Sequence, residues 1–164
     1  MHRRSVLTGT AVALAALPLV GVAQAQDAAL DEAKLPALMG GDFATATSQL
    51  AASKATNGAV KTFAELEIAE QAAVAAAFGS QPGAAGLSEE HASMLAQLEA
   101  AEGAEFDMMY IDGQITGHQE LLAIHQDYAE NGEDPMARGA SMVGVTGIQS
   151  HLVMLESIRA SLGA

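Results

Sequence analysis

Residues 110–125 read YIDGQITGHQELLAIH, an apolar helical pattern that carries two histidines and two acids. At about 100° per residue, Gln114 lies one turn before His118 on the same face of a helix. That face carries the set Ile111, Ile115, His118, Leu122 and His125. Apolar residues at this spacing predict an amphipathic helix. We expect any chemistry of the chain to lie on or near this helix.

Helical segments are expected on both sides of this stretch, because capping and breaker residues divide the chain at regular intervals. Asp42, Ser88 and Asp134 stand where helix N-caps are expected. Gly103 is expected to bend or split the segment that contains the opening stretch. The predicted segments span residues 43–55, 59–78, 88–130 and 136–162.

Four such segments joined by short loops, with no period-two pattern of a strand, predict an all-α fold in the form of an up-and-down four-helix bundle. The domain is expected to cover residues 42–163. Residues 26–41 contain Pro36 and the pair Gly40-Gly41, and are expected to form a flexible leader.

The first 25 residues have the pattern of a secretory signal. Arg3-Arg4 precedes an apolar run, and Ala23-Gln24-Ala25 predicts cleavage after Ala25. Thr, Gly and Pro within the run favour cleavage over a membrane-spanning helix. The arginine pair resembles a twin-arginine signal, although an ordinary basic segment has the same pattern. We therefore expect a periplasmic or otherwise exported protein with no integral membrane span after cleavage.

The composition excludes several classes of function. Removing residues 1–25 leaves five basic residues against 20 acids, a net charge of −15. This charge disfavours binding to nucleic acid and to anionic lipid. The chain has no cysteine, so a metal site would have to use imidazole, carboxylate and amide groups. Its alanine-rich faces could pack against a second subunit, in a homo-oligomer, as readily as inside one bundle.

Acids and histidines interrupt apolar faces on three of the expected helices. Glu67 and Glu70 share a face of the second segment, and His118 and His151 lie on faces of the third and fourth. Such oxygen and imidazole donors suit a divalent metal such as iron, manganese or zinc. The favoured interpretation is that His118 and His151 mainly fix interhelical packing through hydrogen bonds. The alternative is a metal site, for which these four residues are the predicted ligands.

Other candidate groups are weaker. His125 lies about 10.5 Å along the helix from His118, too far to share an ion with it, and is expected to be structural. His91, in the first turn of its segment, is expected to be solvated. A calcium loop at 127–138 fails because Arg138 stands where a bidentate Glu is required. No phosphate-binding loop or nucleophile elbow is present, so no catalytic residue is predicted.

Two further motifs accompany the opening stretch: His151-Leu152, and the run from AASKA at 51–55 to VKTFA at 60–64. With YID at 110–112 and GHQE at 117–120, the chain resembles the bacterial domain-of-unknown-function 4142 family of exported proteins over about residues 42–162. The resemblance implies a ferritin-like four-helix bundle and brings no established activity. Many members of that family carry an acid-His pair where this chain has Glu70-Gln71, which implies a site without a third histidine.

These patterns favour an exported, ferritin-like helical module that acts through binding or envelope-stress protection and is not an enzyme. The alternative is a metal-binding or metal-oxidising bundle built on Glu67, Glu70, His118 and His151. The chain lacks the pair of Glu-x-x-His motifs that ferritin-type di-iron centres use.

Overall fold

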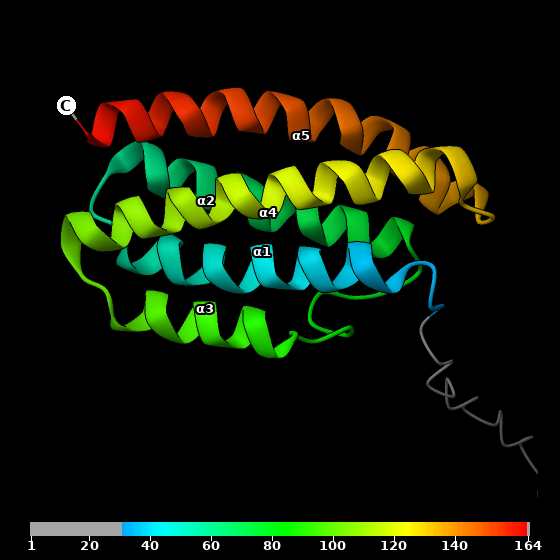
Figure 1. The fold of residues 1–164 in the computed structure, drawn as a ribbon, viewed down its shortest axis with the longest axis horizontal. Coiled ribbons are helices and arrows are strands. Elements are labelled where there is room, and N and C mark those ends of the chain that lie inside the picture. The colour runs from blue at the N-terminus through cyan, green and yellow to red at the C-terminus, as the bar shows by residue number, and fades with distance from the viewer. Residues whose placement is uncertain (1–30, 164) are drawn as a thin grey trace, which may run out of the picture.

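The computed structural model describes residues 31–163, which form five helices and, within that range, no strand. The helices are α1 (Leu35–Lys54), α2 (Gly58–Ala77), α3 (Glu89–Ala100), α4 (Gly103–Asn131) and α5 (Pro135–Leu162) (Figure 1). The predicted all-α class is confirmed. The predicted signal, residues 1–25, lies outside the described residues. None of the five helices combines the length and the apolar character that crossing a bilayer requires.

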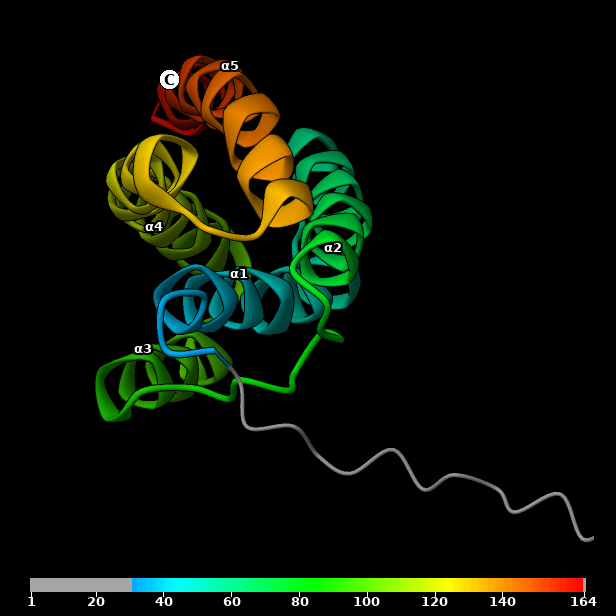
Figure 2. The same cartoon turned by 90° about the vertical axis from the view of Figure 1, so that its right-hand side faces the viewer.

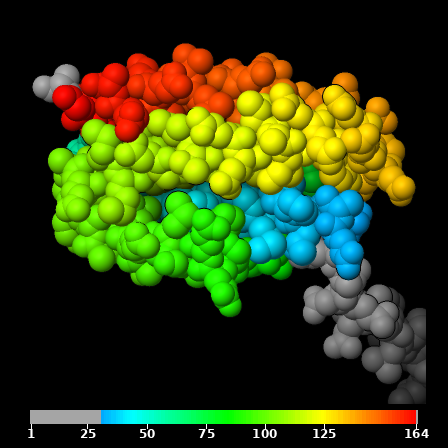
Figure 3. Space-filling view, viewed as in Figure 1, coloured from blue at the N-terminus to red at the C-terminus, as the bar shows by residue number. Residues whose placement is uncertain are grey.

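The four long helices pack side by side around one core, and α3 lies outside them against α1 and α4 (Figure 2). Within this ring, α1 and α5 each adjoin both α2 and α4. On the face drawn in Figure 3, α1 is visible mainly at its N-terminal end, because α3 and α4 cover the rest.

Each helix in the ring runs antiparallel to its two neighbours, so α2 and α4 run in the same direction (Figure 1). The predicted up-and-down order is therefore wrong at one connection. The physical reason lies at Gly103, which adopts the left-handed conformation with φ of 60°. As expected for Gly103, it splits the predicted 88–130 segment, here into two helices. The antiparallel turn at the split was not predicted, and α3 carries the chain back along the bundle before α4 begins.

The start of α1 also differs from the prediction. The helix begins at Leu35, so residues 35–41 of the expected leader are helical. Gly40 and Gly41 lie inside it because neighbouring side chains approach closely. A Cβ on Gly40 would lie 2.7 Å from Leu121 Cδ2, and one on Gly41 would lie 2.6 Å from Gln71 Oε1. The glycine pair serves helix packing here and does not end a segment.

Two buried aspartates hold loops in place. Asp42 was expected to cap a helix, but it lies within α1 and accepts hydrogen bonds from backbone N–H groups at 83, 85 and 86 in the α2–α3 loop. Asp107 of α4 accepts from the backbone N–H groups of Thr56 and Asn57 at 3.0 and 2.8 Å, and from the Thr56 hydroxyl. Each carboxylate thus stabilises a loop that connects two other helices. Ser88 and Asp134 are N-caps, as predicted.

The core has an apolar cluster toward each end of the bundle and a polar layer between them. One cluster surrounds Phe63 and Phe106, and the other surrounds Phe78 and Tyr128. The buried polar side chains between them include Thr47, Ser48, Glu67, Gln71, Gln114 and His118. Because buried polar groups need partners, this layer is where a functional site is expected.

Candidate metal centre

Glu67 of α2, His118 of α4 and His151 of α5 meet in the polar layer. Glu67 Oε2 lies 3.4 Å from both His118 Nε2 and His151 Nδ1, and these two nitrogens are 3.2 Å apart. Glu67 and His118 are buried, while the His151 side chain is 13% exposed. Three of the four predicted ligands are therefore placed so that they could hold one ion.

The spacing of these three atoms fits tetrahedral coordination. With Zn–N and Zn–O bonds of roughly 2.0–2.1 Å, ligand atoms at tetrahedral angles are about 3.3–3.4 Å apart. Octahedral coordination at similar bond lengths would bring neighbouring ligand atoms to about 3.0 Å. The observed separations of 3.2 to 3.4 Å are closer to the tetrahedral value.

Glutamines one helical turn away orient two of the three groups. His118 Nδ1 lies 2.8 Å from the Gln114 carbonyl oxygen, so this nitrogen carries the proton and the lone pair of a neutral His118 lies on Nε2. The Gln71 amide donates to Glu67 Oε1 at 2.8 Å. Glu67 Oε2 receives no hydrogen bond from the residues that the structure describes. Such supporting contacts are typical of metal ligands.

Glu70 is the predicted ligand that does not join the other three. Its Oε2 lies 3.3 Å from His151 Nε2, whereas the atom that faces Glu67 is His151 Nδ1. A carboxylate in this position can accept the outer N–H of a ligating imidazole and orient the ring. Sequence reasoning treated Gln71 as a lost ligand, but its spacing of four residues from Glu67 signals the hydrogen bond that it makes.

Glu67 and His151 shift each other's pKa values. Burial acts to raise the pKa of Glu67, but interactions with His118, His151 and Gln71 outweigh it and lower this pKa to about 2. The contact with Glu67 raises the pKa of His151, against the effect of burial, and the charge of Glu70 adds to the increase. Glu67 is therefore ionised at neutral pH, as a metal ligand must be.

A comparison with protein families matches residues 20–158 to the family described as Domain of unknown function (DUF4142). The chain belongs to this family. The resemblance seen in the sequence is thereby confirmed, and the match includes all four candidate site residues. No curated protein and no solved structure is detectably similar to the chain. Membership of DUF4142 brings no ligand or activity with it, so a functional argument rests on the geometry of the centre.

The remaining histidines of this DUF4142 domain lie apart from the centre. His125 is buried, with Nδ1 3.0 Å from Ser141 Oγ on α5, and burial lowers the pKa of His125. This contact fits the structural role expected for His125. His91 was expected to be solvated, but it is half-buried and its ring stacks on Phe43 with centroids 4.3 Å apart. The packing of α3 against α1, which the sequence pattern did not reveal, accounts for the difference.

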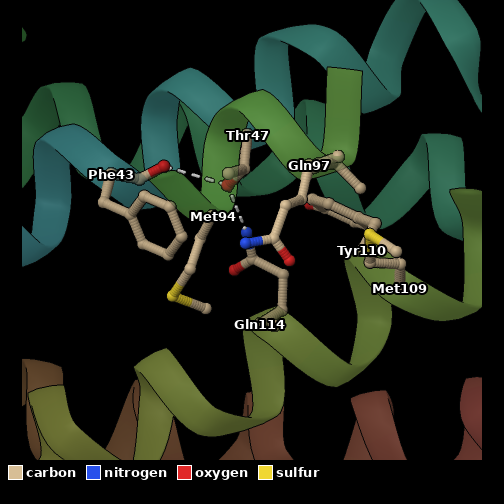
Figure 4. Close-up of a pocket in the computed structure, with 9 residues that line it drawn as sticks. Phe43, Thr47, Met94, Gln97, Met109, Tyr110 and Gln114 are labelled. Carbon is tan, nitrogen blue, oxygen red and sulfur yellow. Dashed lines mark hydrogen bonds between the residues drawn. The ribbon is translucent and has the colours of Figure 1, made fainter. Parts of the chain in front are cut away.

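A small pocket of about 80 Å³ lies among α1, α3 and α4, and Gln114 is one of the residues that line it (Figure 4). The Gln114 amide donates to Thr47 Oγ1 at 2.9 Å, while the backbone carbonyl of the same residue contacts His118. No acid or histidine lines this pocket. The residues that line this pocket of the DUF4142 domain therefore hold Gln114 in place and do not form a second charged site.

Proposed function

We propose that this DUF4142 domain binds one divalent transition-metal ion through Glu67 Oε2, His118 Nε2 and His151 Nδ1. The observation that carries the proposal is Glu67 Oε2, a buried carboxylate oxygen without a hydrogen bond from the described residues that faces two imidazole nitrogens at 3.4 Å. A buried charge is stable when it is paired or coordinates a metal. Two nitrogens and one oxygen at tetrahedral spacing suit zinc best, with iron and manganese as alternatives.

The rival function is purely structural, with His118 and His151 joining helices. In that arrangement a protonated His151 would pair with Glu67 and Glu70. Its single Nδ1 proton can serve either Glu67 or the lone pair on His118 Nε2, and one of these two acceptors is then left unsatisfied in the core. A metal ion satisfies all three atoms at once, which favours the metal-binding function.

The arrangement of the helices supports a ferritin-like domain as a further part of the proposal. Ferritin-like folds have one long crossover connection and carry their metal ligands on facing helices in the bundle core. The crossover through α3 and the ligands from α2, α4 and α5 fit this description. With the signal expected in residues 1–25, we propose metal binding, with a role in envelope-stress protection, in the periplasm or another exported location.

Elemental analysis of the protein after exposure to zinc, iron(II) or manganese(II), followed by removal of unbound metal, tests the proposal. The expected result is about one equivalent of metal per chain, lost in His118→Ala and in His151→Ala. His91→Ala, which removes an imidazole outside the centre, is the matched control and should retain the metal. Absence of metal from the parent protein would refute the proposal, as would full retention in the double variant of His118 and His151.

A further inference from the structure

We infer that the metal centre is open, with its fourth coordination position available to a small neutral molecule that arrives through a groove between α2 and α5. The inference rests on the proposed metal binding. Beyond metal binding, it states the route by which a molecule reaches the ion and the class of molecule that binds there.

Among the histidines and acids that the structure describes, no fourth residue joins the three ligands, and the polar groups that contact those ligands are already engaged. The Gln71 amide donates to Glu67, the Gln114 carbonyl contacts His118 Nδ1, and Glu70 lies at the outer nitrogen of His151. Structural zinc sites are closed by four protein ligands, whereas sites with three protein ligands leave one position for an exogenous molecule. The three-ligand set found here belongs to the second kind.

A groove of about 650 Å³ lies between α2 and α5, and Glu70 is among the residues that line it. These two helices are the most loosely packed neighbours in the ring. Glu70 joins the groove to the centre, because it lines the groove and its carboxylate lies 3.3 Å from His151 Nε2. His151 is also the most exposed of the three ligands. Solvent therefore approaches the centre from the side of this groove.

The chemistry of the groove selects small neutral molecules. Its walls are mostly small or apolar, and Glu70 is the one charged residue among those that line it. An anion would have to pass this carboxylate on a chain with a net charge of −13, which disfavours its entry. Gly147 keeps the inner end of the groove open, since a Cβ there would lie 3.2 Å from Glu70 Oε1.

Nitric oxide and azide, used with the protein loaded anaerobically with iron(II), test this inference as a neutral and an anionic probe. We expect nitric oxide to give the electron paramagnetic resonance signal of an iron–nitrosyl complex, and an equal concentration of azide, added beforehand, to change neither the size of that signal nor the rate at which it forms. Gly147→Leu should slow formation of the nitrosyl complex at least about tenfold, because a leucine side chain fills the close-packed inner end of the groove. Gly147→Ala should slow it less.

Gly139→Leu is the matched control, because Gly139 lines the groove on the same helix and a Cβ there meets nothing within 4 Å. Its rate should equal that of the parent protein. A protein that holds iron but forms no nitrosyl complex would show a closed site and overturn the inference, while metal binding would stand. Failure to hold any metal would instead refute the proposed function. If the nitrosyl complex forms at the same rate in both Gly147 variants and in the parent, small molecules do not reach the ion through this groove. If azide binds the iron readily, the inferred preference for neutral molecules is wrong.

Discussion

Gln71 shows how the candidate centre depends on a residue that is not itself a ligand. Its amide holds Glu67 Oε1, and its own oxygen lies where a side chain on Gly41 would begin. The Gln71 amide thereby connects Gly41 of α1 to Glu67 of α2, and Glu67 in turn contacts His118 of α4. A small change on α1 should consequently alter the affinity of the centre for metal.

Gly41→Ala tests this dependence. The new Cβ would lie 2.6 Å from Gln71 Oε1, so Gln71 must move and release Glu67. We expect the affinity for zinc to fall about 10–100-fold, as for the loss of other supporting contacts to metal ligands. We expect stability to change by less than about 1 kcal/mol, because the clashing atom ends a flexible side chain and alanine is favoured over glycine inside a helix. Competition with a chromophoric chelator measures the affinity, and urea unfolding measures the stability.

Gly139→Ala is the control for that variant, because it makes the same change at an open helical position. It should leave zinc affinity unchanged and raise stability by up to about 1 kcal/mol. An unchanged zinc affinity in Gly41→Ala would show that Gln71 does not position Glu67.

The pKa values of the centre predict how the stability of the metal-free protein depends on pH. Glu67 has a folded pKa of about 2, below its ordinary 4.5, so its contribution is present above pH 4.5 and is lost as the pH falls toward 2. His151 has a raised pKa, so its contribution is present below 6.5 and is lost as the pH rises through its folded pKa. Together these groups should stabilise the metal-free protein most between pH 4.5 and 6.5.

Urea unfolding of the metal-free protein and of His151→Gln across this pH range provides the measurement. The stability difference between the two should be largest between pH 4.5 and 6.5 and should shrink on both sides. Taking the difference removes the contribution of His125, whose lowered pKa makes stability fall as the pH drops below 6.5. A difference that keeps growing above pH 6.5 would contradict the pairing of His151 with Glu67.

Helical periodicity predicted which residues could meet, but it did not separate ligands from their supports. Glu70 and Gln71 lie about 60° and 40° around the helix from Glu67, both within a broad inner face. The structure distinguishes them, because Gln71 is buried while the Glu70 side chain is 37% exposed. This distinction depends on how closely α1 and α5 approach α2, which no pattern within α2 records.

At the scale of the elements, two buried aspartates fix connections between other helices. Asp107→Ala should destabilise the protein by about 2–4 kcal/mol, since it leaves the Thr56 and Asn57 N–H groups without their charged acceptor. Asp112→Ala is a control on the same helix, because Asp112 pairs with Arg159 at the surface and its loss should cost less than about 1 kcal/mol. Chemical denaturation of both variants makes the comparison, and equal effects would contradict the role given to Asp107.

The sequence predicted the elements better than their connections. Caps at Ser88 and Asp134 were predicted correctly because each is a local signal. Gly40-Gly41 and Asp42 were misinterpreted because glycine and aspartate serve both as helix boundaries and as sites of close contact between helices. The partners that distinguish these uses, Leu121, Gln71 and the loop at 83–86, are remote in the sequence.

At the scale of the whole molecule, the proposed ion links α2, α4 and α5, whereas α3 contributes nothing to it. Zinc at 100 times its dissociation constant should stabilise the fold by about 2.7 kcal/mol. Hydrogen exchange followed by mass spectrometry should show slower exchange in α2, α4 and α5 on addition of zinc. Exchange in α3, which has one buried side chain, should stay fast. Zinc-induced protection confined to α3 or to the loops would contradict this account.

The most direct test of the metal centre is anomalous X-ray diffraction from zinc-loaded crystals at the zinc absorption edge. We expect one strong peak inside the bundle, roughly 2.0–2.1 Å from Glu67 Oε2, His118 Nε2 and His151 Nδ1, with Glu70 at the outer nitrogen of His151. A zinc-loaded crystal with no peak at these three atoms, and with the imidazoles of His118 and His151 hydrogen-bonded to each other, would contradict the proposed metal centre.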